Sequence, residues 1–523
     1  MNATKEAQGH GGTGAQTPHR PLRRVLVANR GEIALRVIRA CREEGIESVA
    51  VYSEPDRLAA HVRAADRAIW IGPAPSAESY LRIDKLIAAA RKTEADAIHP
   101  GYGFLSERAE FAAAVADAGL VFIGPPASAI QAMGDKTEAR RRMRAAGVPV
   151  VPGVVEPVAT VEALAVAARG IGYPVLIKAA AGGGGRGMRV VRVEADLAGA
   201  FAAAQGEALK AFGDGRVYVE KLLERPRHVE IQVLGDAHGT VIHLGERECS
   251  IQRRHQKLIE ESPSVAVDPD LRRRMGEAAV RAASAVGYQS AGTCEFLLAP
   301  TGEFYFLEMN TRLQVEHTVT ELVYGIDLVR QQFRVARGEP IAPPPWSAEP
   351  RGWAIECRIT AEDPFAEFMP AGGTIHYLRV PSGPGVRWDG WIEAGTEVPL
   401  HYDSLLGKLV VWAGQRERAI ERMARALDEL IVVGVPTSRE FFQRVMGEPA
   451  FRRGEIDIEY WERVGRGLMS RVAPAHLVEA AAIAATLLEE EDRVHRVGQR
   501  SQAAAGAVRT PWLDAARREG LRG

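Results

Sequence analysis

Polar and apolar side chains alternate along residues 308–316, and this pattern constrains both the fold and the chemistry of the chain. The polar positions are Glu308, Asn310, Arg312, Gln314 and Glu316. Because side chains alternate between the two faces of an extended strand, the pattern predicts that these five share one face. Neighbours on that face are roughly 7 Å apart, so they can hold a cation at one end and a small anion at the other. A solvated edge strand gives the same alternation but needs no ordered mixture of acid, amide and base.

A further acid, Glu295, is expected beside Glu308. Glu295 lies in the apolar run 293–298, which is followed by a turn at 299–302 and by the apolar run 304–307. This order predicts a hairpin that brings the two carboxylates together. Oxygen ligands without Cys or His suit Mg²⁺ or Mn²⁺ held against a phosphate, so we predict a metal site at Glu295, Glu308 and Asn310.

Composition excludes several classes of function. The chain has 523 residues, enough for several domains, and a net charge of −1, which gives no reason to expect nucleic acid or an anionic membrane as partner. Its four cysteines form no CxxC pair, which favours a reducing compartment and argues against a thiolate zinc site. No apolar run is long enough for a membrane span. Residues 1–20 contain no hydrophobic signal core, so we expect a disordered segment and a cytoplasmic protein.

The first part of the chain alternates strands with helices. Strands are predicted at 24–29, 48–52, 96–99 and 121–124, which indicates an α/β fold with a doubly wound parallel sheet. The first strand–helix turn lacks GxGxxG, so a dinucleotide site is not expected there. Residues 99–105 follow a strand's carboxyl end, where such sheets place ligands, although a plain Gly/Pro turn would look the same.

Changes in composition and in the pattern of predicted elements suggest five segments. They are residues 1–20, a doubly wound domain at 21–134, a second domain at 135–335 with a small subdomain at about 150–220, a mainly β domain at 350–462 and an Ala/Arg-rich extension at 466–523. Residues 340–350 are Pro-rich and are predicted to form a linker. In the extension, residues 478–490 form an amphipathic segment. Either a partner-docking helix or a poorly ordered terminus fits the Arg- and Ala-rich tail that follows it.

A glycine loop at 181–187 joins two predicted strands, 173–178 and 188–191. Glycines let backbone N–H groups approach phosphate oxygens without interference from Cβ. The loop lacks GxxxxGK[ST], so it is not a Walker A loop, and a mobile flap over a nucleotide fits better than a plain hairpin tip. Three of the nine lysines surround it, namely Lys136, Lys178 and Lys221, and they can offset phosphate charge. The strand end at Glu220 can offer backbone groups to an adenine.

Two polar stretches follow. Residues 227–232 are predicted to form a strand, whereas residues 245–257 are too polar for a core, and a solvated loop is the plain alternative to a functional cluster there. His255 and Lys257 in the second stretch are chemically useful beside carboxylates. Cys249 is a candidate nucleophile, but a buried, inert thiol is the stronger expectation.

In nine runs the chain resembles the biotin carboxylases of the ATP-grasp superfamily. The matching runs are residues 27–34, 99–107, 133–136, 178 with 182–188, 226–232, 252–257, 308–317, 356–358 with 361–364, and 402–404 with 407–408. They occur in order and at the family's spacing over about residues 22–462. The resemblance implies an N-terminal pre-ATP-grasp domain, an ATP-grasp domain with a mobile glycine-loop lid and a mainly β C-terminal domain.

The resemblance also implies a reaction. ATP phosphorylates bicarbonate to carboxyphosphate, which decomposes, and the CO₂ released carboxylates biotin. Residues similar to the family's ATP contacts are Lys136, Lys178, Gly183, Gly184, Gly185, Gly187, Glu220, Lys221, Leu223, His228, Gln252 and His255. Those similar to its metal ligands for Mg or Mn are Glu295, Glu308 and Asn310. Those similar to its bicarbonate and biotin contacts are Arg312, Gln314, Val315, Tyr102 and Arg358, with Lys257 nearby.

Catalytic roles follow from the same resemblance. Glu316 is similar to the base that deprotonates bicarbonate, and Arg358 to the group that stabilises the biotin enolate. Bicarbonate is a poor nucleophile until it is deprotonated, so a base within hydrogen-bond reach is needed. We expect Arg312 to hold the anion by a fork and to keep Glu316 ionised.

The chain departs from the family at two places. Thr318 follows His317 where the family commonly has Pro, and no Ala-Met-Lys-Met motif or any Lys follows Lys408. We therefore expect a separate biotin carboxyl carrier protein and separate carboxyltransferase subunits. The run Thr510-Pro-Trp512 resembles the segment after the carboxylase region of acyl-CoA carboxylase subunits, and the family suggests a homodimer. Two alternatives are another ATP-grasp ligase acting through an acylphosphate and a non-catalytic assembly scaffold.

Overall fold

The computed structural model describes residues 21–154, 157–179, 188–341, 349–469, 479–490 and 493, without the side chains of Lys136 and Phe212. Residues up to Met469 form one compact unit and Ser470–Gly523 form a second. In the second unit residues 479–490 are helical with exposed side chains. Predictions for residues 1–20, for the glycine loop and for most of the linker and extension lie outside the described residues. Among the described helices, none has the length and apolar character needed to cross a membrane.

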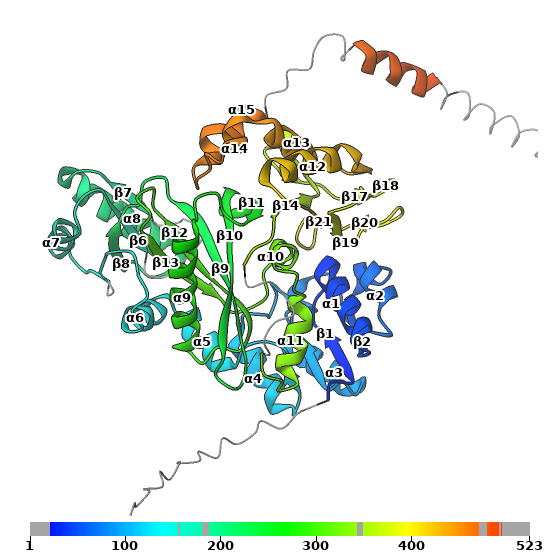
Figure 1. Ribbon diagram of the computed structural model, residues 1–523, viewed down its shortest axis with the longest axis horizontal. Helices are drawn as coiled ribbons and strands as arrows, with labels where there is room; N and C mark the ends of the chain where they lie inside the picture. Colours follow the sequence, from blue (N-terminus) through cyan, green and yellow to red (C-terminus); the bar gives the residue numbers. More distant parts are fainter. Residues whose placement is uncertain are drawn as a thin grey trace, which may run out of the picture. The chain divides into compact units, whose positions relative to one another are not determined.

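A five-stranded parallel sheet forms the N-terminal region, blue to cyan in Figure 1. Its strands in spatial order are β3 (Arg67–Gly72), β2 (Glu47–Ser53), β1 (Arg24–Val27), β4 (Ala97–His99) and β5 (Val121–Phe122). Its helices are α1 (Gly31–Glu43), α2 (Ala60–Ala64), α3 (Ile83–Lys92) and α4 (Ala109–Asp117). Val27 and Leu26 are buried in different core clusters, so both faces of the sheet are covered and the predicted doubly wound fold is confirmed.

A small antiparallel sheet lies in the subdomain predicted at 150–220. Its strands are β7 (Arg189–Val191), β6 (Val175–Ala179) and β8 (Val217–Lys221), in that order. The preceding and covering helices are α5 (Ala127–Gly134), α6 (Lys136–Ala145), α7 (Val161–Ile171) and α8 (Leu197–Phe212). Leu164, Ile177 and Val219 belong to a core of its own, which agrees with a separately packed unit.

An eight-stranded antiparallel sheet is the largest element. Its order is β13 (Phe304–Asn310), β12 (Ser290–Leu298), β9 (Arg227–Gly235), β10 (Val241–Arg253), β11 (Gln256–Ser262), β14 (Trp353–Thr360), β21 (Leu405–Ala413) and β19 (Val386–Gly390). Its neighbouring helices are α9 (Pro269–Ser284), α10 (His317–Tyr324) and α11 (Leu328–Ala336). Figure 1 shows α9 lying along one face, where Met275 and Ala279 pack with Ile231. Because β11 pairs with β14, strands from before and after the Pro-rich segment 340–350 belong to one sheet.

The C-terminal part of the first unit completes this sheet and adds helices. The helices are α12 (Arg416–Glu429), α13 (Arg439–Gly447), α14 (Pro449–Arg452) and α15 (Arg466–Leu468). The short strands are β15 (Glu362–Asp363), β16 (Met369–Pro370), β17 (Gly373–Thr374), β18 (Tyr377–Arg379), β20 (Glu397–Val398) and β22 (Ile431–Val433). Ile420, Phe441 and Phe451 pack with Leu409 in one core cluster. Its strand-rich character matches the prediction for residues 351–412.

Two sequence predictions are wrong here. The strand predicted through residues 308–316 ends at Asn310, and residues 311–316 form turns that lead into α10. The stretch 245–257 is not too polar for the core, because β10 and β11 contain all of it except Arg254 and His255, and its residues from Gly245 to Ile251 are buried. Both differences bring charged groups into the interior of the molecule, where they form the site described next.

Candidate active site

Lys257 is the centre of a buried polar site. Its Nζ lies 2.5 Å from Glu230 Oε2, 2.8 Å from Glu295 Oε1, 2.7 Å from Glu316 Oε1 and 3.2 Å from Gln314 Oε1. Burial alone would lower the pKa of Lys257, but the surrounding carboxylates outweigh it and raise the pKa well above its usual range. Lys257 therefore stays charged and holds side chains from β9, β12 and the loop before α10 in one place.

Glu316 lies between two cations. Besides its contact with Lys257, its Oε2 accepts a hydrogen bond of 2.9 Å from Arg358 Nη2. Burial would raise the pKa of Glu316, but Lys257, Arg358 and Arg247 outweigh it and lower the pKa well below its usual range. Glu316 is therefore an ionised carboxylate in a buried site, which is what a base that accepts a substrate proton needs to be.

Arg312 lies close enough to Glu316 for the two charges to interact, but its direct partners are other groups. Its Nε donates to Glu107 Oε2 at 2.9 Å, and its Nη2 donates to Asn310 Oδ1 at 3.1 Å. The groups that chiefly keep Glu316 ionised are Lys257, Arg358 and Arg247. Because Glu107 also accepts from the Thr311 N–H at 3.1 Å, it fixes the loop as well as the guanidinium.

The loop at 311–316 assembles the site without being a strand. Gln314 Nε2 donates to Glu295 Oε1 at 3.1 Å, and the Gln314 carbonyl accepts from His317 Nδ1 at 2.7 Å. The Val315 carbonyl accepts from the buried Lys408 Nζ at 2.8 Å. The alternate polar residues share partners, since Glu295 binds both Asn310 and Gln314, and Lys257 binds both Gln314 and Glu316. They meet because the loop is folded back, and no single strand face carries them.

The predicted metal ligands lie together. Glu295 and Glu308 are direct cross-strand partners on β12 and β13, as the hairpin predicts, and Asn310 Nδ2 donates to Glu295 Oε1 at 2.8 Å. Burial would raise the pKa of Glu295, but Lys257 and His228 lower it well below its usual range. Two carboxylates and an amide fit a hard divalent cation. His228 Nε2 lies 2.9 Å from Glu295 Oε2, so a histidine also borders this donor set.

The predicted nucleotide contacts have different surroundings in the structure. Lys178 on β6 forms an ion pair with Glu220 on β8, which also accepts from Arg140 Nη2 at 2.7 Å. Lys221 instead donates to the carbonyls of Gly172 and Tyr173 at 2.9 and 3.0 Å, so it braces the neighbouring loop. The predicted contacts Gly183, Gly184, Gly185, Gly187 and the side chain of Lys136 lie outside the described residues.

The remaining predicted nucleotide contacts border the same sheet. Gln252 lies opposite Lys257 in the pairing of β10 with β11, and His255 occupies the turn between these strands with φ of 64°. His228 begins β9 beside Glu295, and Leu223 lies half-buried just after β8. Their positions agree with a nucleotide held between the small sheet and the large one, which stays a prediction.

Arg358 contacts Glu316 directly, and Tyr102 lies near Lys408, which binds the carbonyl of the neighbouring Val315. The carbonyls of Pro100 and Tyr102 both accept from Asn29 Nδ2 at 2.8 Å, which fixes the loop after β4. The Tyr102 ring centroid lies 5.9 Å from Lys408 Nζ. Arg358 also binds Glu260 Oε1 through Nε at 2.6 Å. Tyr102 and Arg358 are therefore both tied to the region around Glu316.

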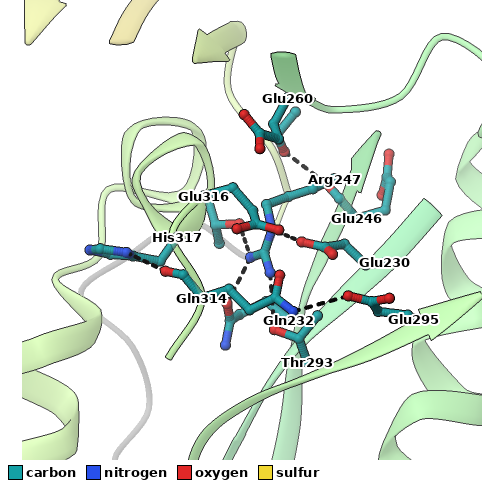
Figure 2. A network of polar contacts seen from close by, with 12 residues as sticks. Glu230, Gln232, Glu246, Arg247, Glu260, Thr293, Glu295, Gln314, Glu316 and His317 are labelled. Carbon is teal, nitrogen blue, oxygen red and sulfur yellow. Dashed lines mark hydrogen bonds and ion pairs between the residues drawn. The ribbon is translucent and has the colours of Figure 1, made fainter. Parts of the chain in front are cut away.

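The sequence did not predict the role of Arg247, a buried residue on β10 that binds several side chains of the site. Arg247 is completely buried and donates from Nε to Glu230 Oε1 at 2.5 Å. Figure 2 shows its guanidinium among Glu230, Gln232, Thr293 and Glu316. A period-two pattern in the sequence could have predicted this strand. Acids and a hydroxyl occupy positions 246, 248 and 250, and they alternate with Arg247, Cys249 and Ile251. Burial raises the pKa of the Cys249 thiol well above its usual range, which agrees with an inert cysteine.

Comparisons with known proteins agree with this geometry. Residues 21–130 match the family described as biotin carboxylase, N-terminal domain, residues 135–343 match carbamoyl-phosphate synthase L chain, ATP binding domain, and residues 356–463 match biotin carboxylase C-terminal domain. A biotin carboxylase of Nostoc sp. is 54% identical over 85% of this chain and 99% of its own. A biotin carboxylase of Haemophilus influenzae is 51% identical, over 84% of this chain and 98% of its own.

Solved structures give the same answer. The crystal structure of a biotin carboxylase–β-γ-ATP complex from Campylobacter jejuni superposes with a TM-score of 0.80 at 50% identity, covering 85% of this chain and 99% of that one. The chain belongs to the biotin carboxylase family of ATP-dependent ligases.

Proposed function

We propose that this chain carboxylates biotin held on a separate carrier protein, with ATP and bicarbonate as the other substrates. The observation that carries the proposal is the buried Glu316 carboxylate between Lys257 and Arg358. A base that removes the proton of bicarbonate must be ionised and must face cations that stabilise the resulting charge. Glu316 meets both conditions, which a nucleotide-binding scaffold has no need of.

The residues around Glu316 have separate roles in the proposed reaction. Glu316 accepts the proton of bicarbonate, while Lys257 and Arg358 keep it ionised and aimed at the site. Arg312, Gln314 and the Val315 backbone bind the bicarbonate anion, and Arg358 stabilises the oxyanion that develops on biotin. Magnesium or manganese, held by Glu295, Glu308 and Asn310, would neutralise charge building between the phosphates of ATP. The glycine loop is expected to exclude water from carboxyphosphate.

The first test is release of ADP by the purified chain. We expect turnover with Mg-ATP to depend on bicarbonate and to rise when free biotin is added, because the two substrates use groups of one site. Omitting each component in turn is the control. ADP release that ignores both bicarbonate and biotin would favour another ATP-grasp ligase or a scaffold with residual ATPase activity.

A second prediction concerns Glu107, which holds Arg312. Glu107→Gln keeps an acceptor for the Thr311 N–H but removes the charge that fixes the guanidinium. We expect KM for bicarbonate to rise roughly two- to fivefold, the size typical of a partly exposed ion pair, with a smaller change in kcat. Steady-state kinetics at varied bicarbonate measure both. A fall in kcat at unchanged KM would show that Arg312 acts on the reaction and not on binding.

The partners and location are proposed from the same family membership. A biotin carboxyl carrier protein and carboxyltransferase subunits would complete an acetyl-CoA or other acyl-CoA carboxylase, and the chain itself would form a homodimer in the cytoplasm. The four cysteines are all buried and unpaired, which suits a reducing compartment. Light scattering of the purified chain measures its mass in solution. A monomer at working concentration would contradict the proposed dimer.

A further inference from the structure

Two buried carboxyls face each other behind the site. Glu260 on β11 and Glu356 on β14 are direct partners in the antiparallel pairing, and both are 0% exposed. Side chains at such positions start roughly 5 Å apart at Cβ. Two carboxylates this close in a buried layer repel each other unless cations or a proton compensate them.

Each carboxyl has one bound and one unbound oxygen. Glu260 Oε1 accepts from Arg358 Nε at 2.6 Å, and Glu356 Oε2 accepts from the hydroxyl of Thr318. Within the described part of the chain, Glu260 Oε2 and Glu356 Oε1 are buried and have no hydrogen-bond partner. A buried acceptor without a partner is costly, and a proton on one carboxyl reduces that cost.

The cations nearby are already shared. Arg358 pairs with Glu316 at 2.9 Å as well as with Glu260, and Lys257 pairs with Glu316 on the far side. Lys408 faces Glu356, but its Nζ lies 3.3 Å from the buried Glu32 and donates to the Val315 carbonyl. Glu356 therefore has no cation of its own, and the pair with Glu260 carries more negative charge than its surroundings balance.

Titration behaviour agrees with a retained proton. Burial is the largest influence on both groups and raises the pKa of Glu260 to about 8 and that of Glu356 to about 7. Arg358 and Lys257 oppose the rise at Glu260, while Glu356 and Glu316 add to it. Lys408, the Thr318 hydroxyl and Arg358 oppose the rise at Glu356, while Glu316 adds to it. One proton shared by the two carboxyls at neutral pH follows.

Thr318 decides where that proton lies. It stands in the first turn of α10, two residues after Glu316, at the position where the family commonly has Pro. Its hydroxyl donates to Glu356, which favours the ionised form of that carboxyl and leaves the proton on Glu260. A protonated Glu260 holds Arg358 less strongly, so more of the Arg358 charge acts on Glu316 and on the substrate side.

We propose that Thr318 is a positioning residue for Arg358, acting through the facing carboxyls of Glu356 and Glu260. By keeping Glu356 ionised and Glu260 protonated, its hydroxyl leaves Arg358 free to serve Glu316 and the developing oxyanion. The part of this inference that concerns catalysis rests on the proposed function. The part that concerns the shared proton stands on the contacts alone.

The test replaces Thr318 by Val, which removes the hydroxyl and keeps the shape. We expect kcat at neutral pH to fall roughly tenfold, the equivalent of about one pK unit, with KM for ATP unchanged. In the parent, kcat should fall at alkaline pH as the carboxyl pair loses its shared proton. In Thr318→Val this alkaline limb of the pH profile should move up by about one pH unit, because the ionised Glu356 loses its hydrogen bond and the pair keeps its proton to higher pH. A purely structural role would lower activity at every pH and leave the limb in place.

Two further variants and a spectroscopic reading separate the outcomes. Thr318→Ser restores the hydroxyl and should restore the pH profile. Glu356→Gln removes the like charge beside Glu260 but leaves its burial, so the alkaline fall in kcat should move to lower pH. Infrared titration of the protonated carboxyl band follows the proton without any turnover, and the band should persist about one pH unit higher in Thr318→Val and disappear at lower pH in Glu356→Gln. A Thr318→Val profile and band that superimpose on the parent would overturn the proposal, even in a protein that failed to carboxylate biotin.

Discussion

Replacing Glu316 by Gln is expected to lower bicarbonate-dependent, biotin-stimulated kcat by about a hundred- to ten-thousand-fold, the usual range for removal of a general base. Gln can still accept a hydrogen bond from Lys257 but cannot take the proton of bicarbonate. The fold should survive, since Lys257 keeps Glu230 and Glu295, and Arg358 keeps Glu260. Rapid-quench or coupled measurement of ADP, together with the thermal midpoint of the variant, tests both statements.

Glu321→Gln provides the matched control. Glu321 lies on α10, five residues after Glu316, and is buried with Arg36 at 2.9 Å and Arg387 at 2.8 Å. Burial would raise its pKa, but these arginines lower it from 4.5 to about 2, so its contribution to stability is present above pH 4.5 and disappears as pH falls towards 2. The control should lose stability and keep kcat. Equal loss of activity in both variants would show that α10 had simply been disrupted and that Glu316 is not the base.

The hairpin that carries the metal ligands could be predicted from sequence. Two apolar runs around a short turn predict paired strands, and the structure pairs Glu295 with Glu308 as that pattern requires. The continuation to Glu316 could not be predicted in the same way. Alternation is also satisfied by a loop whose polar side chains find partners on several other elements of the chain. Arg312 finds Glu107, which is 205 residues away in the chain, and no local rule reveals such a contact.

The charged strands beneath the site show a second limit of sequence reasoning. A stretch as polar as residues 245–257 predicts exposure when each residue is considered alone, because burying an unpaired charge is costly. In the fold, Glu246 pairs with Arg272 on α9, and Glu248 accepts from Ser250 and Ser264. Ser250 lies on the same strand, but Arg272 and Ser264 come from other parts of the chain. Burial of the stretch therefore follows from tertiary pairing, which periodicity does not report.

Replacing Arg247 by Met is expected to cost about 3–5 kcal/mol of unfolding free energy, the range for removing one partner of a buried ion pair. The guanidinium is 0% exposed and donates to Glu230, to Gln232 at 2.7 Å, and to Thr293 and Thr320 at 3.0 Å each. Met fills much of the volume but satisfies none of these acceptors. Lys should rescue little, because one ammonium cannot reproduce a planar fork with partners on three sides. Urea unfolding followed by fluorescence and circular dichroism measures the change.

Arg273→Met separates burial from charge in the same experiment. Arg273 is 58% exposed on α9 and pairs with Asp270 at 2.7 Å and Glu277 at 2.9 Å, so it also has two carboxylate partners at hydrogen-bond distance. Water and salt screen those pairs, and the variant should lose no more than about 1 kcal/mol. If the two variants unfolded at the same urea concentration, the hydrogen bonds of the Arg247 guanidinium to Glu230 and its neighbours would not be what stabilises the site. A large difference would mean that the position of Glu230, and through it of Lys257, depends on a residue that touches no substrate.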